Sequence, residues 1–154
     1  MRARAVLLGL LMSGLCLGSQ GAFGQELRRA ILSEIKGPVE VRLEDGSWKP
    51  AENGMVLYEQ GEIRSGEGGF AEILLDEGGS TGKLELQEKS HLRLSTLNWD
   101  EASGKKETYL DLAIGKVLVH AEKLQGDSKF EVRTPNATAG VRGTVFEVSV
   151  DEEE

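Results

Sequence analysis

Few residues in this 154-residue chain have the types and spacing that enzyme chemistry requires. Gly78-Gly79-Ser80-Thr81-Gly82 matches the Gly-x-Ser-x-Gly pattern of a hydrolase nucleophile, which needs a strand before the serine and a helix after it. Lys83 to Gln87 instead alternate between polar and apolar residues, which predicts a strand. Gly82-Lys83 also resembles the end of a phosphate-binding loop, but Leu84 stands where that loop needs a Ser or Thr for magnesium. We interpret the segment as a glycine-rich turn.

The titratable side chains give no stronger signal. His91 and His120 are the only residues whose ordinary pKa lies near neutrality, and neither has metal-ligand spacing to a Cys, a second His or a carboxylate cluster. Strand alternation places both on the solvent side. The 26 Asp and Glu residues leave a carboxylate pair for glycoside hydrolysis as an alternative, although no two acids are singled out. The sequence therefore predicts a protein that is not an enzyme and that has no cofactor and no metal.

Residues 1–24 have the pattern of a secretory signal peptide. Arg2 and Arg4 precede an apolar run from Ala5 to Met12, and Ala22-Phe23-Gly24 is a small-x-small cleavage signal. The apolar run is shorter than the roughly 20 residues of a membrane-spanning helix, and no second such run follows. We expect a mature chain of residues 25–154, periplasmic or secreted, without a membrane span. Because Cys16 lies in the leader, that chain has no cysteine for disulfide or thiol chemistry.

The charge of the mature chain limits its partners. The leader holds two Arg and no acidic residue, so its removal takes the net charge from −8 to −10. An acidic surface repels phosphate backbones and anionic lipids, which excludes nucleic acid as a partner. Residues 151–154, Asp-Glu-Glu-Glu, are interpreted as a solvated acidic tail. The length fits a single domain with one hydrophobic core.

The periodicity of the mature chain predicts an all-β fold. Apolar residues recur at every second position, and 20 Gly but only 3 Pro separate the runs. We expect about nine or ten short, mainly antiparallel strands in a β-sandwich or a β-solenoid-like arrangement. Asp45-Gly46 predicts a hairpin turn, and the polar run from Asn98 to Glu107 predicts a protruding loop. Gly-x-apolar-x-apolar recurs after Gly37, Gly82 and Gly115, too irregularly for a true repeat.

The segment from Phe130 to Val148 closes the domain. Pro135 cannot donate a ladder hydrogen bond, so it is expected to end the strand that begins at Phe130. Gly140 and Gly143 allow a sharp or bulged path into the last strand. Between them, Arg142 is expected to be the most constrained charge of the domain. Its five donors would then pair with a carboxylate or with free carbonyls and pin that corner, a structural role that we favour over ligand contact.

The motifs resemble those of the FecR-type domain family, in what would be a stand-alone exported form. In chain order they are Gly-x-Val-x-Val from Gly37, Trp48 with Pro-Ala after it, Gly-Glu-Ile-Arg-Ser-Gly from Gly61, and Asp-x-Gly-Gly-Ser from Asp76. The most specific element is Thr-Pro followed by Val-Arg-Gly-Thr. Its residues are interpreted as structural, and they are Thr134, Pro135, Ala137, Val141, Arg142, Gly143, Thr144 and Phe146.

The resemblance implies an exported, mostly β, non-catalytic module. In iron-responsive members the domain is the periplasmic part of a membrane-spanning regulator that controls a sigma factor. This chain has no internal membrane helix, so we expect an interaction or sensing module that binds a protein partner or a surface polymer in the cell envelope. Two alternatives are kept. One is a partner subunit of a trans-envelope signalling system controlling a sigma factor, and the other is a small secreted hydrolase that uses carboxylates.

Overall fold

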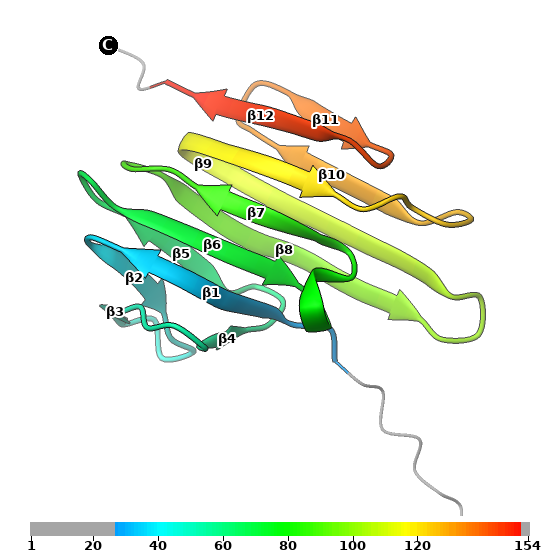
Figure 1. The fold of residues 1–154 in the computed structure, drawn as a ribbon, viewed down its shortest axis with the longest axis horizontal. Coiled ribbons are helices and arrows are strands. Elements are labelled where there is room, and N and C mark those ends of the chain that lie inside the picture. The colour runs from blue at the N-terminus through cyan, green and yellow to red at the C-terminus, as the bar shows by residue number, and fades with distance from the viewer. Residues whose placement is uncertain (1–26, 152–154) are drawn as a thin grey trace, which may run out of the picture.

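The computed structural model describes residues 27–151 (Figure 1). The predicted signal peptide, residues 1–24, and the last three acidic residues lie outside this range. Strand makes up 58% of the structure, which confirms the all-β prediction; the described residues contain one short 3-10 turn, η1 (Glu77–Gly79), and no α-helix. The strands are β1 (Ala30–Lys36), β2 (Val39–Arg42), β3 (Trp48–Pro50), β4 (Val56–Leu57), β5 (Glu62–Ser65), β6 (Phe70–Leu75), β7 (Gly82–Leu86), β8 (His91–Asp100), β9 (Lys105–Ala121), β10 (Lys129–Arg133), β11 (Thr138–Val141) and β12 (Val145–Val150).

The strands form one curled sheet that folds over on itself into two layers. Nine strands follow one hydrogen-bonded path, β3-β2-β5-β8-β9-β7-β6-β1-β4, and β10, β11 and β12 attach to β9 or to one another. Sheet A holds β4, β1, β6, β7, the second part of β9 and β12. Sheet B holds β3, β2, β5, β8, the first part of β9, β10 and β11. All pairs are antiparallel except β9 with β10.

Glycines mark the bends at which the chain passes from one sheet to the other. Strand β9 pairs in sheet B up to Ile114 and in sheet A from Gly115, where φ is +89°. A Cβ atom at Gly115 would lie 2.5 Å from the Cα of Ser90 in the neighbouring bend, so only glycine fits there. Gly37 has φ of +64° between β1 and β2 and is equally crowded, by the backbone of residues 68 and 69. Two of the three recurring glycines noted in the sequence, Gly37 and Gly115, therefore lie at these bends.

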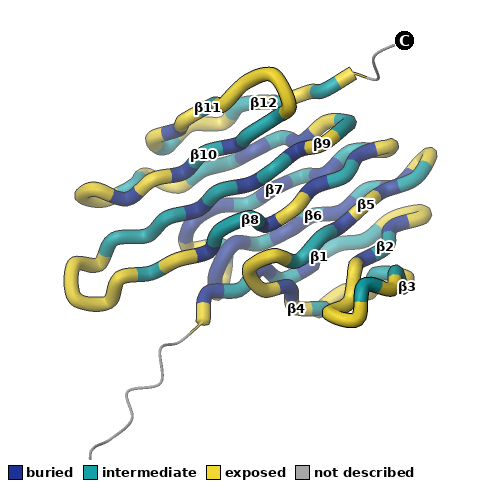
Figure 2. The backbone as a smooth tube through the Cα atoms, turned by 180° about the vertical axis from the view of Figure 1, so that it is seen from behind, coloured by how far each residue is buried: buried dark blue, intermediate teal, exposed yellow. Residues whose placement is uncertain are grey.

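The core lies between the two layers and follows the period of the strands. Leu84 and Leu86 of β7 and Leu92 and Leu94 of β8 are each 0% exposed, and the buried positions alternate with polar ones that face outward (Figure 2). The inward set from both sheets forms one cluster, which includes the large side chain of Phe130. This alternation is the reason that the sequence predicted the all-β fold, although the structure has twelve strands where about nine or ten were expected.

Two local expectations need correction or refinement. The run from Asn98 to Glu107 is not a loop, because β8 continues to Asp100, β9 begins at Lys105, and their residues stay paired out to the tip. It is polar because this hairpin arm extends beyond the packed layers (Figure 1). The Asp45-Gly46 hairpin is confirmed between β2 and β3, where Gly46 has φ of +84° and the Leu43 N–H donates to the Ser47 carbonyl at 2.8 Å.

A buried arginine closes the end of the sandwich opposite the bends. The side chain of Arg28 is 3% exposed, and its Nε donates to both carboxylate oxygens of Asp76 at 2.9 and 3.1 Å. Its other nitrogens donate to the carbonyls of Asn98 and Glu107 and to the hydroxyls of Thr81 and Thr108. These partners belong to both sheets, so one guanidinium ties sheet A to sheet B. We call this set the Arg28 network.

Candidate functional site

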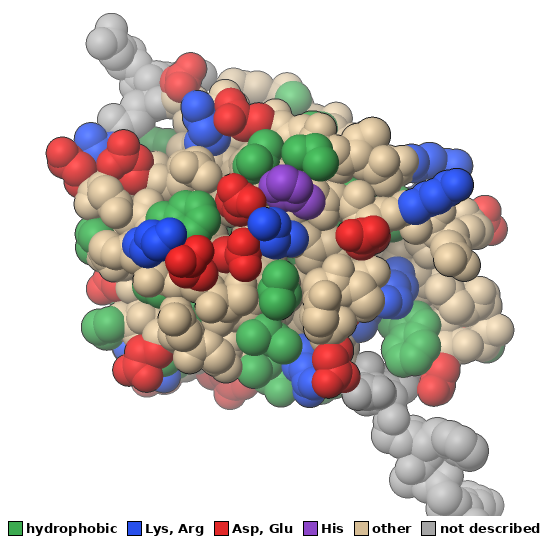
Figure 3. All heavy atoms as spheres, in the orientation of Figure 1, with side chains coloured by type: hydrophobic (Ala, Val, Ile, Leu, Met, Phe, Trp, Pro, Cys, Tyr) green, Lys and Arg blue, Asp and Glu red, His purple; other side chains and the backbone are tan. Residues whose placement is uncertain are grey.

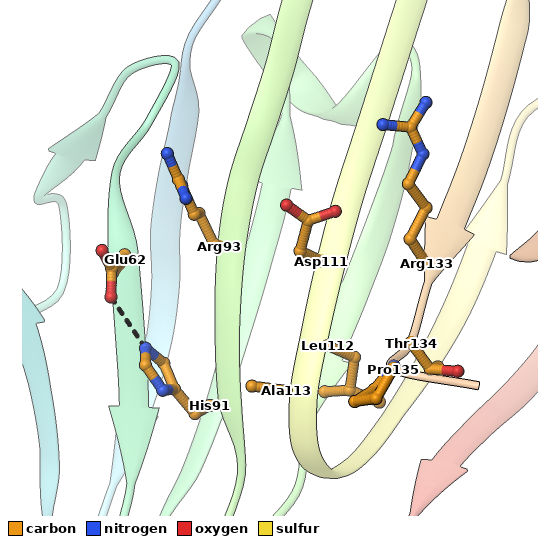
Figure 4. A pocket seen from close by; sticks show the side chains of 9 residues that line it. All are labelled: Glu62, His91, Arg93, Asp111, Leu112, Ala113, Arg133, Thr134 and Pro135. Carbon is orange, nitrogen blue, oxygen red and sulfur yellow. Dashed lines mark hydrogen bonds and ion pairs between the residues drawn. The ribbon is translucent and has the colours of Figure 1, made fainter. Parts of the chain in front are cut away.

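A groove of about 380 Å³ runs across the outer face of sheet B (Figure 4). It spans four neighbouring strands, β5, β8, β9 and β10, and ends at the turn that follows β10. We call it the Thr-Pro groove. Its lining residues are Glu62, His91, Arg93, Asp111, Leu112, Ala113, Arg133, Thr134 and Pro135.

Strand register aligns charges of alternating sign along this groove. In the strand register Arg42 lies opposite Glu62, Glu62 opposite Arg93, Arg93 opposite Asp111, and Asp111 opposite Arg133, so the row crosses five strands. Directly opposed residues of neighbouring strands share a face of the sheet, about 5 Å apart. The groove therefore presents opposite charges at intervals of one strand.

The β5 side of the groove is held rigid by hydrogen bonds. Glu62 accepts from His91 Nε2 at 2.8 Å and from Arg42 Nη1 at 2.9 Å. Burial works against ionisation of Glu62, but the hydrogen bonds from His91 and Arg42 outweigh it and hold the pKa of this carboxyl below its ordinary value. The His91 ring also meets Trp48 edge to face, with 5.6 Å between ring centroids. This side of the groove is a preorganised acceptor and aromatic wall.

The β9 and β10 side offers charges with fewer protein partners. Arg133 stacks on the ring of Tyr109, 4.2 Å from its centroid, and donates to Glu131 at 3.2 Å. Arg93 donates to the amide oxygen of Gln60 and pairs with no carboxylate among residues 27–151. Asp111, between the two arginines, forms no ion pair within that same part of the chain (Figure 4). Guanidinium, carboxylate and aromatic groups on one flat face can bind polar side chains or sugar hydroxyls through hydrogen bonds.

The residues that the sequence singled out for nucleophilic or metal chemistry lie in different parts of the fold. Within residues 27–151, no three His, Cys, Asp or Glu side chains are grouped to hold a metal ion. Ser80 lies in the turn before β7, and a strand follows it instead of a helix, so the nucleophile-elbow pattern is accidental as predicted. His91 and His120 lie on outer faces and are half-buried, at 35% and 33% side-chain exposure. His120 Nε2 is buried 3.2 Å from Glu85, without hydrogen-bond geometry.

Two of the sequence-predicted motif residues, Thr134 and Pro135, line the groove. Strand β10 ends at Arg133, directly before them, as the proline predicted. The Thr134 N–H donates to the Ala137 carbonyl at 2.8 Å, and the Ala137 N–H donates to the Thr134 hydroxyl at 3.0 Å. These bonds close the β10–β11 turn and fix where the proline ring stands.

The rest of the motif lies elsewhere. Val141 is buried at the end of β11, Phe146 of β12 packs half-buried against the core, and Thr144 is exposed. Gly143 has φ of +72° and lies against Lys123, whereas Gly140 is an ordinary strand residue with open space around it.

The expected role of Arg142 is not seen. Its residue is exposed, and within residues 27–151 its side chain forms no hydrogen bond or ion pair. It lies in the link from β11 to β12, where water can hydrate the guanidinium and no buried carbonyl or carboxylate of the described residues accepts a hydrogen bond from it. The buried, fully paired arginine of this domain is Arg28.

Glu62, Arg93, Asp111 and Arg133 were missed as site residues from the sequence. Each is a polar residue that alternates with apolar neighbours along its strand, and many other surface positions of the sequence show the same pattern. What singles them out is their register across β5, β8, β9 and β10, and strands β5 and β10 are far apart in the chain. The available signal was the Thr-Pro turn, because it lies beside this row.

The outer face of sheet A differs in charge pattern (Figure 3). Glu34, Glu72 and Glu85 are directly opposed on β1, β6 and β7, which alone would be destabilising. Lys83 lies 3.0 Å from both Glu72 and Glu85 and neutralises the repulsion. Hydrogen bonds from Ser33 and Lys83 hold the pKa of Glu72 below its ordinary value. The charges of this face are satisfied within the sheet, which leaves the Thr-Pro groove as the better candidate site.

Together, the fold and the groove define an all-β domain with a charged groove on the outer face of sheet B. The described residues contain no helix long and apolar enough to cross a membrane. The model of the FecR protein family matches residues 61–154, more than half of the sequence, and the chain belongs to this family. The family is generally a sensing and signalling module in sigma-factor regulation, and its members are regulatory and non-catalytic. No curated protein and no solved structure matches the chain.

Proposed function

We propose that this protein is an exported, non-catalytic FecR-family module that binds a protein partner or a surface polymer of the cell envelope through the Thr-Pro groove. The observation that supports this most directly is the place of the family motif. Thr134 and Pro135 border the one row in which Arg93, Asp111 and Arg133 alternate. Rigid strands hold these groups, as precise recognition requires.

The compartment in this proposal is the periplasm or the exterior of the cell. The signal-peptide pattern of residues 1–24 supports export, and a mature chain of residues 25–154 without cysteine tolerates an oxidising compartment. Within this proposal the mature chain needs neither a cofactor nor a membrane span. The family match favours the second candidate, a partner subunit of a trans-envelope signalling system that controls a sigma factor.

Affinity capture with the mature protein from a periplasmic extract, read by mass spectrometry and glycan analysis, tests the proposal. Parallel captures use the double variant Arg93→Gln/Arg133→Gln and the control Arg64→Gln. Arg64 lies on the same face, paired with Glu40 at 2.7 Å and stacked on Trp48, but outside the groove.

We expect a partner that the parent and Arg64→Gln retain and that the double variant loses. Stoichiometric recovery of a membrane regulator or an outer-membrane receptor would select the signalling candidate. Equal recovery by all three proteins would show that the groove is not the binding surface. Turnover of a glycan by the parent would overturn the non-enzyme proposal.

A further inference from the structure

Exposed apolar side chains gather at the edge of the molecule formed by β3 and β4. Among residues 27–151 five large apolar residues are exposed, and three of them, Leu43 at 38%, Val56 at 42% and Tyr58 at 49%, line one groove of about 930 Å³. Scattered apolar residues are ordinary, whereas a contiguous group marks an interaction site. We call this the seam groove. It is lined by Val41 to Gly46, Lys49 and Met55 to Glu62.

The seam groove lies where the curled sheet does not close. Strands β3 and β4 are the two ends of the strand order, each paired on one side only, and residues of both line the groove. Figures 1 and 2 both place them at the same edge of the molecule, away from β11 and β12. An edge strand presents N–H and C=O groups that no neighbour uses. The shape that satisfies such an edge is another extended segment.

The rim of the seam groove is acidic. Four carboxylates, Glu44, Asp45, Glu59 and Glu62, face two cations, Arg42 and Lys49. Arg42 is already paired with Glu62 at 2.9 Å, so Lys49 is the one further cation of the lining against three carboxylates. Asp45 also accepts from Ser47 and Glu59 from the Leu97 N–H, but these neutral donors leave both negative charges in place. An occupant with basic side chains would complement this rim and would be attracted to it from solution.

We propose that the seam groove binds an extended segment of a partner protein in which apolar residues alternate with lysine or arginine, added as a strand beside β4. Alternation is required because successive side chains of a strand point to opposite faces. One face of the segment packs its apolar side chains on Leu43, Val56 and Tyr58, and the other turns its cations to the acidic rim. Only Glu62 is shared with the lining of the Thr-Pro groove, so this surface is a second one.

The test titrates the full chain into a fluorescein-labelled synthetic peptide of alternating lysine and valine, seven residues long, with fluorescence anisotropy as the readout. The comparison peptide has glutamate in place of each lysine. We expect saturable binding of the lysine peptide that weakens at high ionic strength, and no binding of the glutamate peptide.

Matched variants locate the binding. Val56→Asn should lower the affinity for the lysine peptide by roughly tenfold, equivalent to about 1.4 kcal/mol. Glu44→Lys should lower this affinity several-fold. Val145→Asn and Glu101→Lys are the controls, since Val145 is 62% exposed on β12 and Glu101 lies at the tip of the β8–β9 arm. Both should bind like the parent. If Val56→Asn changes the melting temperature, Leu43→Asn takes its place.

Three results would overturn the proposal. They are equal binding by the parent and both groove variants, equally tight binding of the glutamate peptide, and a parent that dimerises through this groove. Dimerisation would appear in sedimentation as a concentration-dependent species that Val56→Asn removes. Because Arg93→Gln/Arg133→Gln leaves the seam groove intact, failure here and failure of the Thr-Pro groove can be told apart.

Discussion

Replacing Arg28 by methionine tests whether one buried guanidinium holds the two sheets together. The substitution keeps much of the side-chain volume but removes the guanidinium donors to Asp76 and to the carbonyls of Asn98 and Glu107. Thr81 and Lys106 still donate to Asp76. Removing one partner of a buried ion pair costs about 3–5 kcal/mol, and each orphaned carbonyl adds about 1 kcal/mol or more. Lys106, 3.2 Å from Asp76, retains part of the charge balance. We therefore expect a loss of at least about 3 kcal/mol in the free energy of unfolding.

Urea unfolding of the full chain, followed by far-UV circular dichroism, measures this loss. The matched control is Arg29→Met, because Arg29 is 37% exposed and pairs at 3.9 Å with a Glu77 side chain that is 85% exposed. Such a surface pair should contribute less than about 0.5 kcal/mol. The double variant Arg28→Met/Asp76→Asn should recover part of the loss, since it no longer buries a carboxylate that has lost its guanidinium partner. A loss below about 1 kcal/mol for Arg28→Met, or an equal loss for Arg29→Met, would refute the reasoning.

Three further predictions concern pH and the bends of the chain. Burial raises the pKa of Asp76, but the hydrogen bonds from Arg28 and Thr81 and the positive charges of Arg28 and Lys106 lower it more. The contribution of Asp76 to stability is therefore present above about pH 4 and is lost as pH falls through the folded-state value. Asp76→Asn should flatten the acid side of the stability profile, and parallel profiles of variant and parent would contradict this. Gly143→Val should lower stability by more than about 2 kcal/mol in thermal unfolding, because φ is +72° and its Cβ would lie 2.8 Å from a backbone atom. The control Gly140→Val should have little effect. Equal losses of stability in the two variants would refute the argument. Gly115→Ala should prevent folding as judged by circular dichroism. The control Gly104→Ala, also at positive φ but in open space, should lower the free energy of unfolding by only about 1 kcal/mol. A folded Gly115→Ala protein would show that the bend can relax.

The sequence predicted the elements that bury one face and misread those that do not. Leu84 and Leu92 belong to strands with a clear period of two, and both are fully buried. The arm from Asn98 to Glu107 is polar on both faces because it extends past the core, so its strands carried no alternation to read. Hydrophobic period reports burial, and a paired but solvated strand gives no such signal. The continuity of β9 was hidden for a related reason, since its bend at Gly115 depends on the close approach of Ser90 in the neighbouring bend.

The candidate sites were harder to predict because they depend on register and on distant contacts. The partners of Arg28 lie 48 to 80 residues away in the chain, so nothing near it in sequence marks it as buried. Arg142 lies inside the family motif and was therefore predicted to be a paired structural residue, yet it is exposed. The Thr-Pro turn was the correct pointer to the groove, whereas Asp111 and Arg133 could be placed there only by the parallel pairing of β9 with β10.

Strand β9 sets how this domain comes apart. It pairs with β7, β8, β10 and β12 and belongs to both layers, so neither layer can persist once β9 leaves. The three strands that follow it, β10, β11 and β12, are attached to the rest of the sheet only through β9. Residues 129–150 can therefore detach as a unit while strands β1 to β9 stay paired with one another. We expect hydrogen exchange to find the lowest opening energy in this final unit and a single shared, higher opening energy for the rest.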